Sequence, residues 1–240
     1  MPRRRRPGSR PCYFVTYRGL GPLAAVEGVP PLRHAEHGGL AVETSERGRG
    51  GNRLRNLRRN FEHTLGINAC MARLARDAAR VGHPRPYWWS EAEATRRFRY
   101  EGSTFWIRPD AAGIYYLGKQ RHPFLFEYDR GTMRHRDYMR KLAGLVAFFA
   151  SETAEDIYGR HLNLLVVSES HDGERRFASA ISASEYREGI DLHALLTTTE
   201  LIRSNGLGLL GPIWWELGQQ RRRTWLGEIK MPARPIGTVP

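Results

Sequence analysis

Three carboxylates in this sequence have the spacing of a cation-binding or acid–base site. Glu127 and Asp129 end the apolar run 123–128, and Asp110 precedes the strand-like run 113–117. Side chains two residues apart on a strand point to the same face, so Glu127 and Asp129 would share one face at the carboxyl end of a strand. If the two runs pair as a hairpin, Asp110 lies beside them. Three converging carboxylates require a divalent ion, a shared proton or an arginine to neutralise them.

Lys141 stands out because only three of the 38 basic residues are lysines, at positions 119, 141 and 230. An ammonium group approaches a phosphate or an attacking water as a point charge, which a planar guanidinium does not. A simpler interpretation remains open for both features. The carboxylates would then be an ordinary strand end paired with Arg108 and Arg130, and Lys141 would be a helix-surface residue paired with Asp137.

Hydrophobic periodicity predicts the elements that would position these residues. A long helix is expected over residues 53–80, a short polar helix over 91–97, a helix carrying Lys141 over 134–152 and another over 173–182. Strands are expected at 87–89, 104–107, 113–117, 123–128, 162–167 and 192–197, with a turn at 118–122. The core order of helix, three strands, helix and strand indicates a single α/β domain with a mixed sheet, from about residue 52 to residue 240. Residues 1–51 form a separate basic N-terminal segment and linker.

The amino-acid composition indicates which class of partner the protein binds and in which cellular compartment it works. The 240 residues carry a formal net charge of +13, nearly all of the excess as arginine, which predicts a polyanionic partner. With 40% hydrophobic residues the chain can form a core, so global disorder is excluded. No apolar run is long enough for a membrane span, and the basic start lacks the apolar stretch of a secretory signal. Two cysteines, Cys12 and Cys70, and no zinc-ligand pattern favour a reduced, cytoplasmic protein.

The order of these residues and elements resembles the PD-(D/E)XK core of restriction-endonuclease-like proteins. Pro109-Asp110, the run from Glu127 to Asp129 and Lys141 on the next helix carry this resemblance. More narrowly, several strings over about residues 52–215 are similar to the replication-relaxation protein family. The strings are Asn60 to Asn68, Trp89 to Glu91, Arg108 to Ala111, Phe126 to Thr132 and Lys141-Leu142.

The resemblance implies a DNA-binding protein of a plasmid or mobile element that acts in replication, relaxation or conjugative transfer as a metal-dependent endonuclease or nickase. Asp110, Glu127 and Asp129 would hold Mg²⁺ or Mn²⁺, and Lys141, displaced from position 129 to the helix, would stabilise the phosphate. The partners would be DNA and other plasmid replication or transfer proteins. Residues 11–26 resemble the end of the winged-helix domain found in that family, so the N-terminal segment is expected to be a truncated remnant of it.

Two other functions remain as alternatives. The first is a DNA-binding accessory protein that keeps the fold without catalysis, and the second is an RNA-processing protein. Several weaker features accompany them. Glu62-His63 on the long helix is a further candidate metal or proton site. Four tyrosines could serve as relaxase nucleophiles or fill the core: Tyr115, Tyr116, Tyr128 and Tyr138. Four tryptophans could stack on bases or pack in the core: Trp88, Trp89, Trp214 and Trp215.

Overall fold

The computed structural model describes residues 22, 25, 28 and 60–226 of the chain. The chain divides into two compact units, Met1–Thr64 and Leu65–Pro240. Apart from residues 22, 25 and 28, the predicted winged-helix remnant at 11–26 and the basic segment 1–51 lie outside the described residues, as does the first part of the helix predicted over 53–80. The fold below is that of the second unit.

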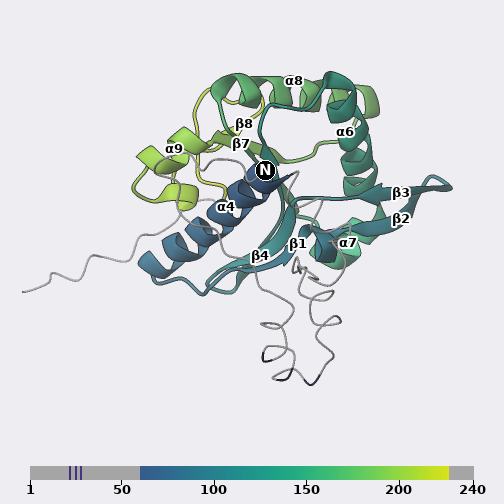
Figure 1. The fold of residues 1–240 in the computed structure, drawn as a ribbon. Helices are drawn as coiled ribbons and strands as arrows, with labels where there is room; N and C mark the ends of the chain where they lie inside the picture. Colours follow the sequence, from purple (N-terminus) through teal and green to yellow (C-terminus); the bar gives the residue numbers. More distant parts are fainter. Residues whose placement is uncertain (1–21, 23–24, 26–27, 29–59, 227–240) are drawn as a thin grey trace, which may run out of the picture. The chain divides into compact units, whose positions relative to one another are not determined.

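A six-stranded mixed sheet forms the centre of this unit, in the order β1-β4-β5-β6-β7-β8 (Figure 1). Strands β4 and β5 form an antiparallel hairpin, and β1 pairs antiparallel with β4 on the outer side. Strands β5, β6 and β7 run parallel, while β8 returns antiparallel. The bounds are β1 Tyr87–Ser90, β4 Ala111–Leu117, β5 Gln120–Asp129, β6 Asn163–Ser168, β7 Ala194–Thr198 and β8 Trp215–Glu216.

Helices pack on both faces of the sheet. On one face, Met71, Leu74 and Ala78 of α4 (Phe61–Arg80) share a buried cluster with Phe124 and Phe126 of β5. On the other face, α6 (His135–Phe149) and α8 (His171–Glu188) pack over the remaining side chains of the same strands. Because β5 and β6 are buried on both faces, they appear in the sequence as nearly continuous apolar runs.

Short helical segments connect these strands and helices, and serine side chains cap the starts of two of the helices. Ser151 caps α7 (Glu152–Tyr158) by accepting a hydrogen bond from the amide of Ala154, and Ser170 caps α8 in the same way from Gly173. Side-chain caps of this kind satisfy amides that have no partner inside the helix. Beyond β7 the chain forms α9 (Thr199–Ser204) and the 3₁₀ turn η1 (Gly208–Leu210) before β8.

A second, two-stranded sheet is inserted between β1 and β4. It follows the short helix α5 (Glu91–Ala94) and consists of β2 (Arg96–Tyr100) and β3 (Ser103–Ile107). Its two-residue turn, Glu101-Gly102, has positive φ at both positions, 46° and 75°. Such a turn matches the twist of a hairpin, and glycine adopts it without strain. The hairpin projects beyond α6 at the right of Figure 1.

Most predicted elements of the core are present, and the differences are local. The polar helix predicted to reach Arg97 ends at Ala94, because the arginine-rich run that follows is strand β2. The helix predicted over 134–152 is divided into α6 and α7 by Ser151. The turn predicted at 118–122 is tighter, since β4 ends at Leu117 and β5 begins at Gln120. Within the described residues, no helix is long and apolar enough to cross a membrane.

Candidate functional site

Asp110 lies where β4 begins, next to the end of β5, as the hairpin predicts. The register pairs Ala111 with Phe126, which places Asp110 level with the residues that follow Phe126. The amide of Tyr128 donates a hydrogen bond of 2.7 Å to Asp110 Oδ2. Asp110 is buried, and this bond fixes its carboxylate at the sheet end that also carries Glu127.

Glu127 and Lys141 form an ion pair between the sheet and helix α6. Lys141 Nζ donates to Glu127 Oε2, and the Glu127 side chain is only 1% exposed while that of Lys141 is 25% exposed. Glu127 Oε1 is buried and has no hydrogen-bond partner. Lys141 is therefore directed toward the carboxylates of the sheet, and the alternative of a surface lysine paired with Asp137 does not describe its position.

The electrostatics of this site are strongly coupled. Burial raises the pKa of Glu127 well above its ordinary value, Lys141 acts to lower that pKa, and the neighbouring Asp110 raises it further. Burial acts to lower the pKa of Lys141, but Glu127 and Asp110 outweigh it and the pKa is raised. Lys141 thus holds a positive charge next to two carboxylates that repel each other.

Asp129 is held separately from this pair, although it lies on the same face of β5. Its Oδ1 accepts hydrogen bonds from the hydroxyl of Tyr138, at 2.7 Å, and from the amide of Gly131, at 2.9 Å. Its Oδ2 is buried without a hydrogen-bond partner. Tyr138 and Lys141 are three residues apart on α6, so one helix engages both acids of the strand.

The Asp110–Glu127 pair opens into a surface pocket beneath the β2–β3 hairpin. Four of the lining side chains are acidic, three are basic and one is aromatic, so the opening brings basic groups that can contact an anionic ligand close to acids that can hold a cation. The lining residues are Glu91, Trp106, Ile107, Arg108, Asp110, Glu127, Asp137, Arg140, Lys141 and Leu145.

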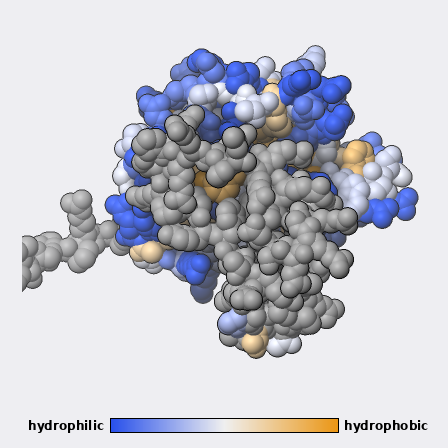
Figure 2. Space-filling model, in the orientation of Figure 1, coloured by the Kyte–Doolittle hydropathy of each residue, from blue (hydrophilic) through white to orange (hydrophobic). Residues whose placement is uncertain are grey.

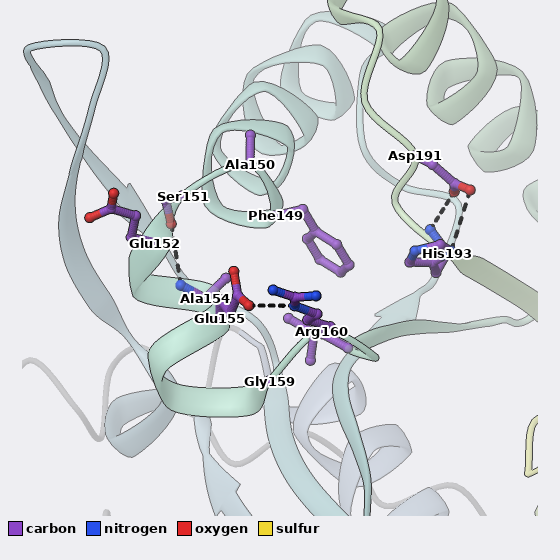
Figure 3. A pocket seen from close by; sticks show the side chains of 11 residues that line it. Phe149, Ala150, Ser151, Glu152, Ala154, Glu155, Gly159, Arg160, Asp191 and His193 are labelled. Carbon is purple, nitrogen blue, oxygen red and sulfur yellow. Dashed lines mark hydrogen bonds and ion pairs between the residues drawn. The ribbon is translucent and has the colours of Figure 1, made fainter.

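A second pocket lies at the opposite end of the sheet, where β6 and β7 begin (Figure 3). Its polar side chains are exposed and pair with one another: Arg160 with Glu155 at 2.7 Å, and His193 with Asp191 at 3.3 Å. Ser151 in its wall is committed to capping α7. Because these groups are exposed and satisfy each other, the pocket lacks buried carboxylates like those of Asp110 and Glu127.

The Asp110–Glu127 pair fits a hard divalent ion. Mg²⁺ in proteins is usually held by one or two carboxylates, with water and substrate phosphate as the remaining ligands. Glu127 Oε1 is a buried oxygen without a hydrogen-bond partner next to a second carboxylate, which is a suitable donor set. Within residues 60–226, no group of three or more His, Cys, Asp or Glu is arranged to hold a metal ion. The metal role of Asp129 stays a prediction.

The other candidate residues are not among those that line the pocket. Tyr115, Tyr128 and Tyr138 are buried, and burial is the main cause that raises the pKa of each hydroxyl, which disfavours them as nucleophiles. Trp214 is fully buried in the core, and Trp88, Trp89 and Trp215 are half-buried. Glu62 and His63 lie in the first turn of α4.

Sequence reasoning did not single out Trp106 and Arg140, which line the pocket. The signal for Trp106 is its place in the run Phe105-Trp106-Ile107, where strand alternation points the middle residue away from the core. For Arg140, adjacency to Lys141 at the first half of α6 is the available clue.

Comparison with families of known proteins gives one match. Residues 2–164 match the family model described as replication-relaxation, which covers more than half of the chain and includes the site residues described above. The match begins well before residue 52, where the resemblance in the sequence was expected to start, and ends before residue 215. Comparisons with curated proteins and with solved structures find no match. The chain belongs to the replication-relaxation family.

Proposed function

We propose that this protein is a metal-dependent DNA endonuclease or nickase that acts in the replication, relaxation or transfer of a plasmid or mobile element. The observation that carries the proposal is the convergence of Asp110, Glu127 and Lys141 at the mouth of one pocket. Two carboxylates can hold a metal ion and one ammonium group can stabilise developing phosphate charge, which together can support phosphodiester hydrolysis. Family membership supports the replication or relaxation setting.

The order of elements supports the nuclease-like core. Helix α4 is followed in the main sheet by β1, β4 and β5, then by α6 and β6, with β4 antiparallel to its neighbours. The sequence predicted a helix, three-strand, helix, strand order in one sheet. In the structure the strand predicted at 104–107 is β3 of the separate hairpin, and β1, β4 and β5 are the three strands of the main sheet between the helices. The candidate acids lie at one end of β4 and β5, where α/β proteins commonly bind ligands.

In this proposal each residue has a defined task. Asp110 and Glu127 would hold the divalent ion, with Asp110 oriented by the amide of Tyr128. Lys141 keeps its proton because its pKa is raised, so its positive charge can stabilise the charge that develops on the phosphate. Arg108 and Arg140 at the pocket mouth would contact neighbouring phosphates.

When bound, the metal ion would neutralise phosphate charge and lower the pKa of an attacking water. Phosphate would compete with Glu127 for Lys141, so Glu127 would be available to hold the ion together with Asp110. No covalent protein intermediate is needed, because water is the attacking group. The nearby hydroxyl of Tyr138 is buried and donates to Asp129, so it is not available as a nucleophile. Asp129 is expected to fix the start of α6 through its hydrogen bond from Tyr138. The prediction that Asp129 also supplies a third oxygen to the metal is the secondary part of this proposal.

One observation favours a second candidate function. Lys141 already neutralises Glu127 through the ion pair, so the two residues could serve stability alone in a non-catalytic DNA-binding accessory protein. Incubation of supercoiled plasmid with the protein and Mg²⁺ or Mn²⁺ separates the two functions. Nicked or linear product that requires the metal supports the nuclease, whereas binding with no product at any metal concentration supports the accessory protein.

A further inference from the structure

The β2–β3 hairpin has two chemically different faces. Cross-strand pairs place Arg97 opposite Trp106 and Arg99 opposite Thr104, and strand alternation directs these four side chains to one face. All four are exposed, and Trp106 is 57% exposed, a large fraction for a tryptophan. We call Arg97, Arg99, Thr104 and Trp106 the outer face of the hairpin.

The opposite face fixes the hairpin to the body of the unit. Phe98 packs edge-on against Phe148 of α6, with ring centroids 5.2 Å apart, and stacks on Phe105 across the hairpin at 5.8 Å. At Gly144 of α6, an added Cβ would lie 3.0 Å from the carbonyl oxygen of Trp106, so helix and strand pack closely there. The helix that carries Lys141 therefore also holds the backbone of Trp106, and the outer face has a defined place next to the site.

The outer face carries positive charge and an open aromatic ring. The guanidinium carbon of Arg97 lies 6.0 Å from the centroid of the Trp106 ring, which is within the range of a cation–π contact. Within the hairpin, residues 96–107, the one carboxylate is Glu101, which lies in the turn and outside this face. No ion pair to Arg97 or Arg99 is formed within the described residues, so their charge is available to an anion.

Trp106 also lines the pocket that contains Asp110, Glu127 and Lys141. A polyanion that places one phosphate at Lys141 would therefore have Arg108 and Trp106 within the same pocket. The surface above α8 at the top of Figure 2 is also hydrophilic, but the hairpin combines arginines with an exposed aromatic ring at the pocket itself.

We propose that the outer face of the β2–β3 hairpin binds unpaired DNA flanking the cleaved phosphate, with a base stacked on Trp106 and phosphates paired with Arg97 and Arg99. Charge complementarity and the exposed ring support this occupant. Bases in a duplex are already stacked on each other and do not present their faces, whereas an unpaired base stacks readily on an aromatic side chain. This inference rests on the proposed function, because it assumes that the pocket acts on DNA.

The test measures binding in EDTA, where metal-dependent cleavage cannot occur. Fluorescence anisotropy compares an oligo(dT) strand of about 20 nucleotides with a blunt duplex of the same length, for wild type, Trp106→Ala and Trp106→Phe. We expect Trp106→Ala to weaken oligo(dT) binding about tenfold or more and duplex binding less than about twofold. Trp106→Phe should recover part of the loss, because a smaller ring still stacks. Equal binding of oligo(dT) by wild type and Trp106→Ala would overturn the inference.

The salt dependence of binding measures the contribution of Arg97 and Arg99 separately. Removal of one phosphate contact to single-stranded DNA lowers the slope of log affinity against log salt by roughly 0.7, so Arg97→Gln with Arg99→Gln should lower it by roughly 1.4. The far end of the main sheet offers a matched pair, Tyr116 opposite Arg121, which is also exposed. Tyr116→Ala and Arg121→Gln should leave the affinity for oligo(dT) unchanged, and losses equal to those at the hairpin would refute a local binding face.

The same assay tests whether RNA rather than DNA is the partner. Oligo(rU) in place of oligo(dT) should bind no more tightly if DNA is the partner, and stronger binding of oligo(rU) that depends on Trp106 would replace the DNA assignment by RNA. Because all these measurements exclude cleavage, failure of the hairpin inference is distinguishable from failure of the nuclease proposal. A wild-type level of plasmid nicking together with unaltered oligo(dT) binding in Trp106→Ala would reject only the hairpin inference.

Discussion

Lys141 of α6 donates to Glu127 of β5, and this ion pair joins the helix to the carboxylates of the sheet. The pair places an ammonium group next to two buried acids at a pocket mouth. In the proposed nuclease it offsets part of the negative charge of the two acids and then supplies positive charge to the phosphate. The first predictions concern this pair.

Lys141→Arg should lower the cleavage rate by about 10²-fold, although the charge is kept. A planar guanidinium cannot occupy the point that the ammonium occupies next to Glu127, and loss of one preorganised electrostatic contact typically has this effect. Rates of plasmid nicking at saturating Mg²⁺ measure it. Full activity in both Lys141→Arg and Lys141→Met would remove Lys141 from the mechanism.

Lys141→Met should destabilise the protein by about 3 kcal/mol near neutral pH, because it leaves the buried charge of Glu127 unpaired. In unfolded chains glutamate has a pKa of about 4.3, and in the folded variant the pKa of Glu127 is raised further once Lys141 is gone. The folded state then binds its proton more tightly than the unfolded state, so stability is retained below the unfolded pKa and lost as pH rises through the raised folded pKa.

Urea unfolding of wild type and Lys141→Met over a series of pH values checks this. The difference in unfolding free energy should grow with pH, and it should shrink when Glu127→Gln is added to Lys141→Met. A difference independent of pH, or one that the second substitution does not reduce, would contradict the buried pair.

Tyr138→Phe should cost about 1 to 3 kcal/mol of stability while cleavage is retained, because it removes the hydrogen bond to Asp129 and no nucleophile. Tyr158 is an equally buried tyrosine whose hydroxyl has no hydrogen-bond partner, so Tyr158→Phe is a matched control that should cost little. Thermal unfolding and nicking assays measure both effects. Loss of all cleavage in Tyr138→Phe alone would point to a covalent tyrosine mechanism.

DNA affinity should fall steeply with salt. The chain's net charge of +13 predicts binding through phosphate contacts, and about six or more of them would reduce affinity by orders of magnitude between low and moderate ionic strength. Anisotropy titrations of a duplex at several salt concentrations provide the slope. A flat dependence would show that the arginine excess does not drive binding.

The sequence predicted those parts of the fold whose hydrophobic period is regular. The continuous apolar runs of β5 and β6 and the stripe on α6 identify their elements because both kinds of pattern follow directly from burial. The first two residues of strand β2 were assigned to a helix and the rest of β2 was not predicted, because three of its five residues are arginines and its strand character depends on pairing with β3. Pairing between distant residues is set by tertiary structure, which local patterns do not contain.

The same limit applies to the site. The two strand-like runs that pair as the β4–β5 hairpin were sufficient to predict Asp110 beside Glu127, and the structure has this arrangement. For Lys141, helical spacing left two partners open, and only the packing of α6 on the sheet selects Glu127. The engagement of Asp129 by Tyr138 has no signal in the sequence, since both residues had other plausible roles.

Plasmid cleavage by charge-neutralised variants tests our proposal that Asp110 and Glu127 form the catalytic metal site. Supercoiled plasmid with Mg²⁺ or Mn²⁺ is incubated with wild type, Asp110→Asn, Glu127→Gln and, as a control, Glu155→Gln, an exposed acid at the opposite end of the sheet. We predict nicked or linear plasmid with wild type and Glu155→Gln and none with the other two, while all three variants bind DNA at least as tightly as wild type. Cleavage by both Asp110→Asn and Glu127→Gln at the wild-type rate would contradict the account.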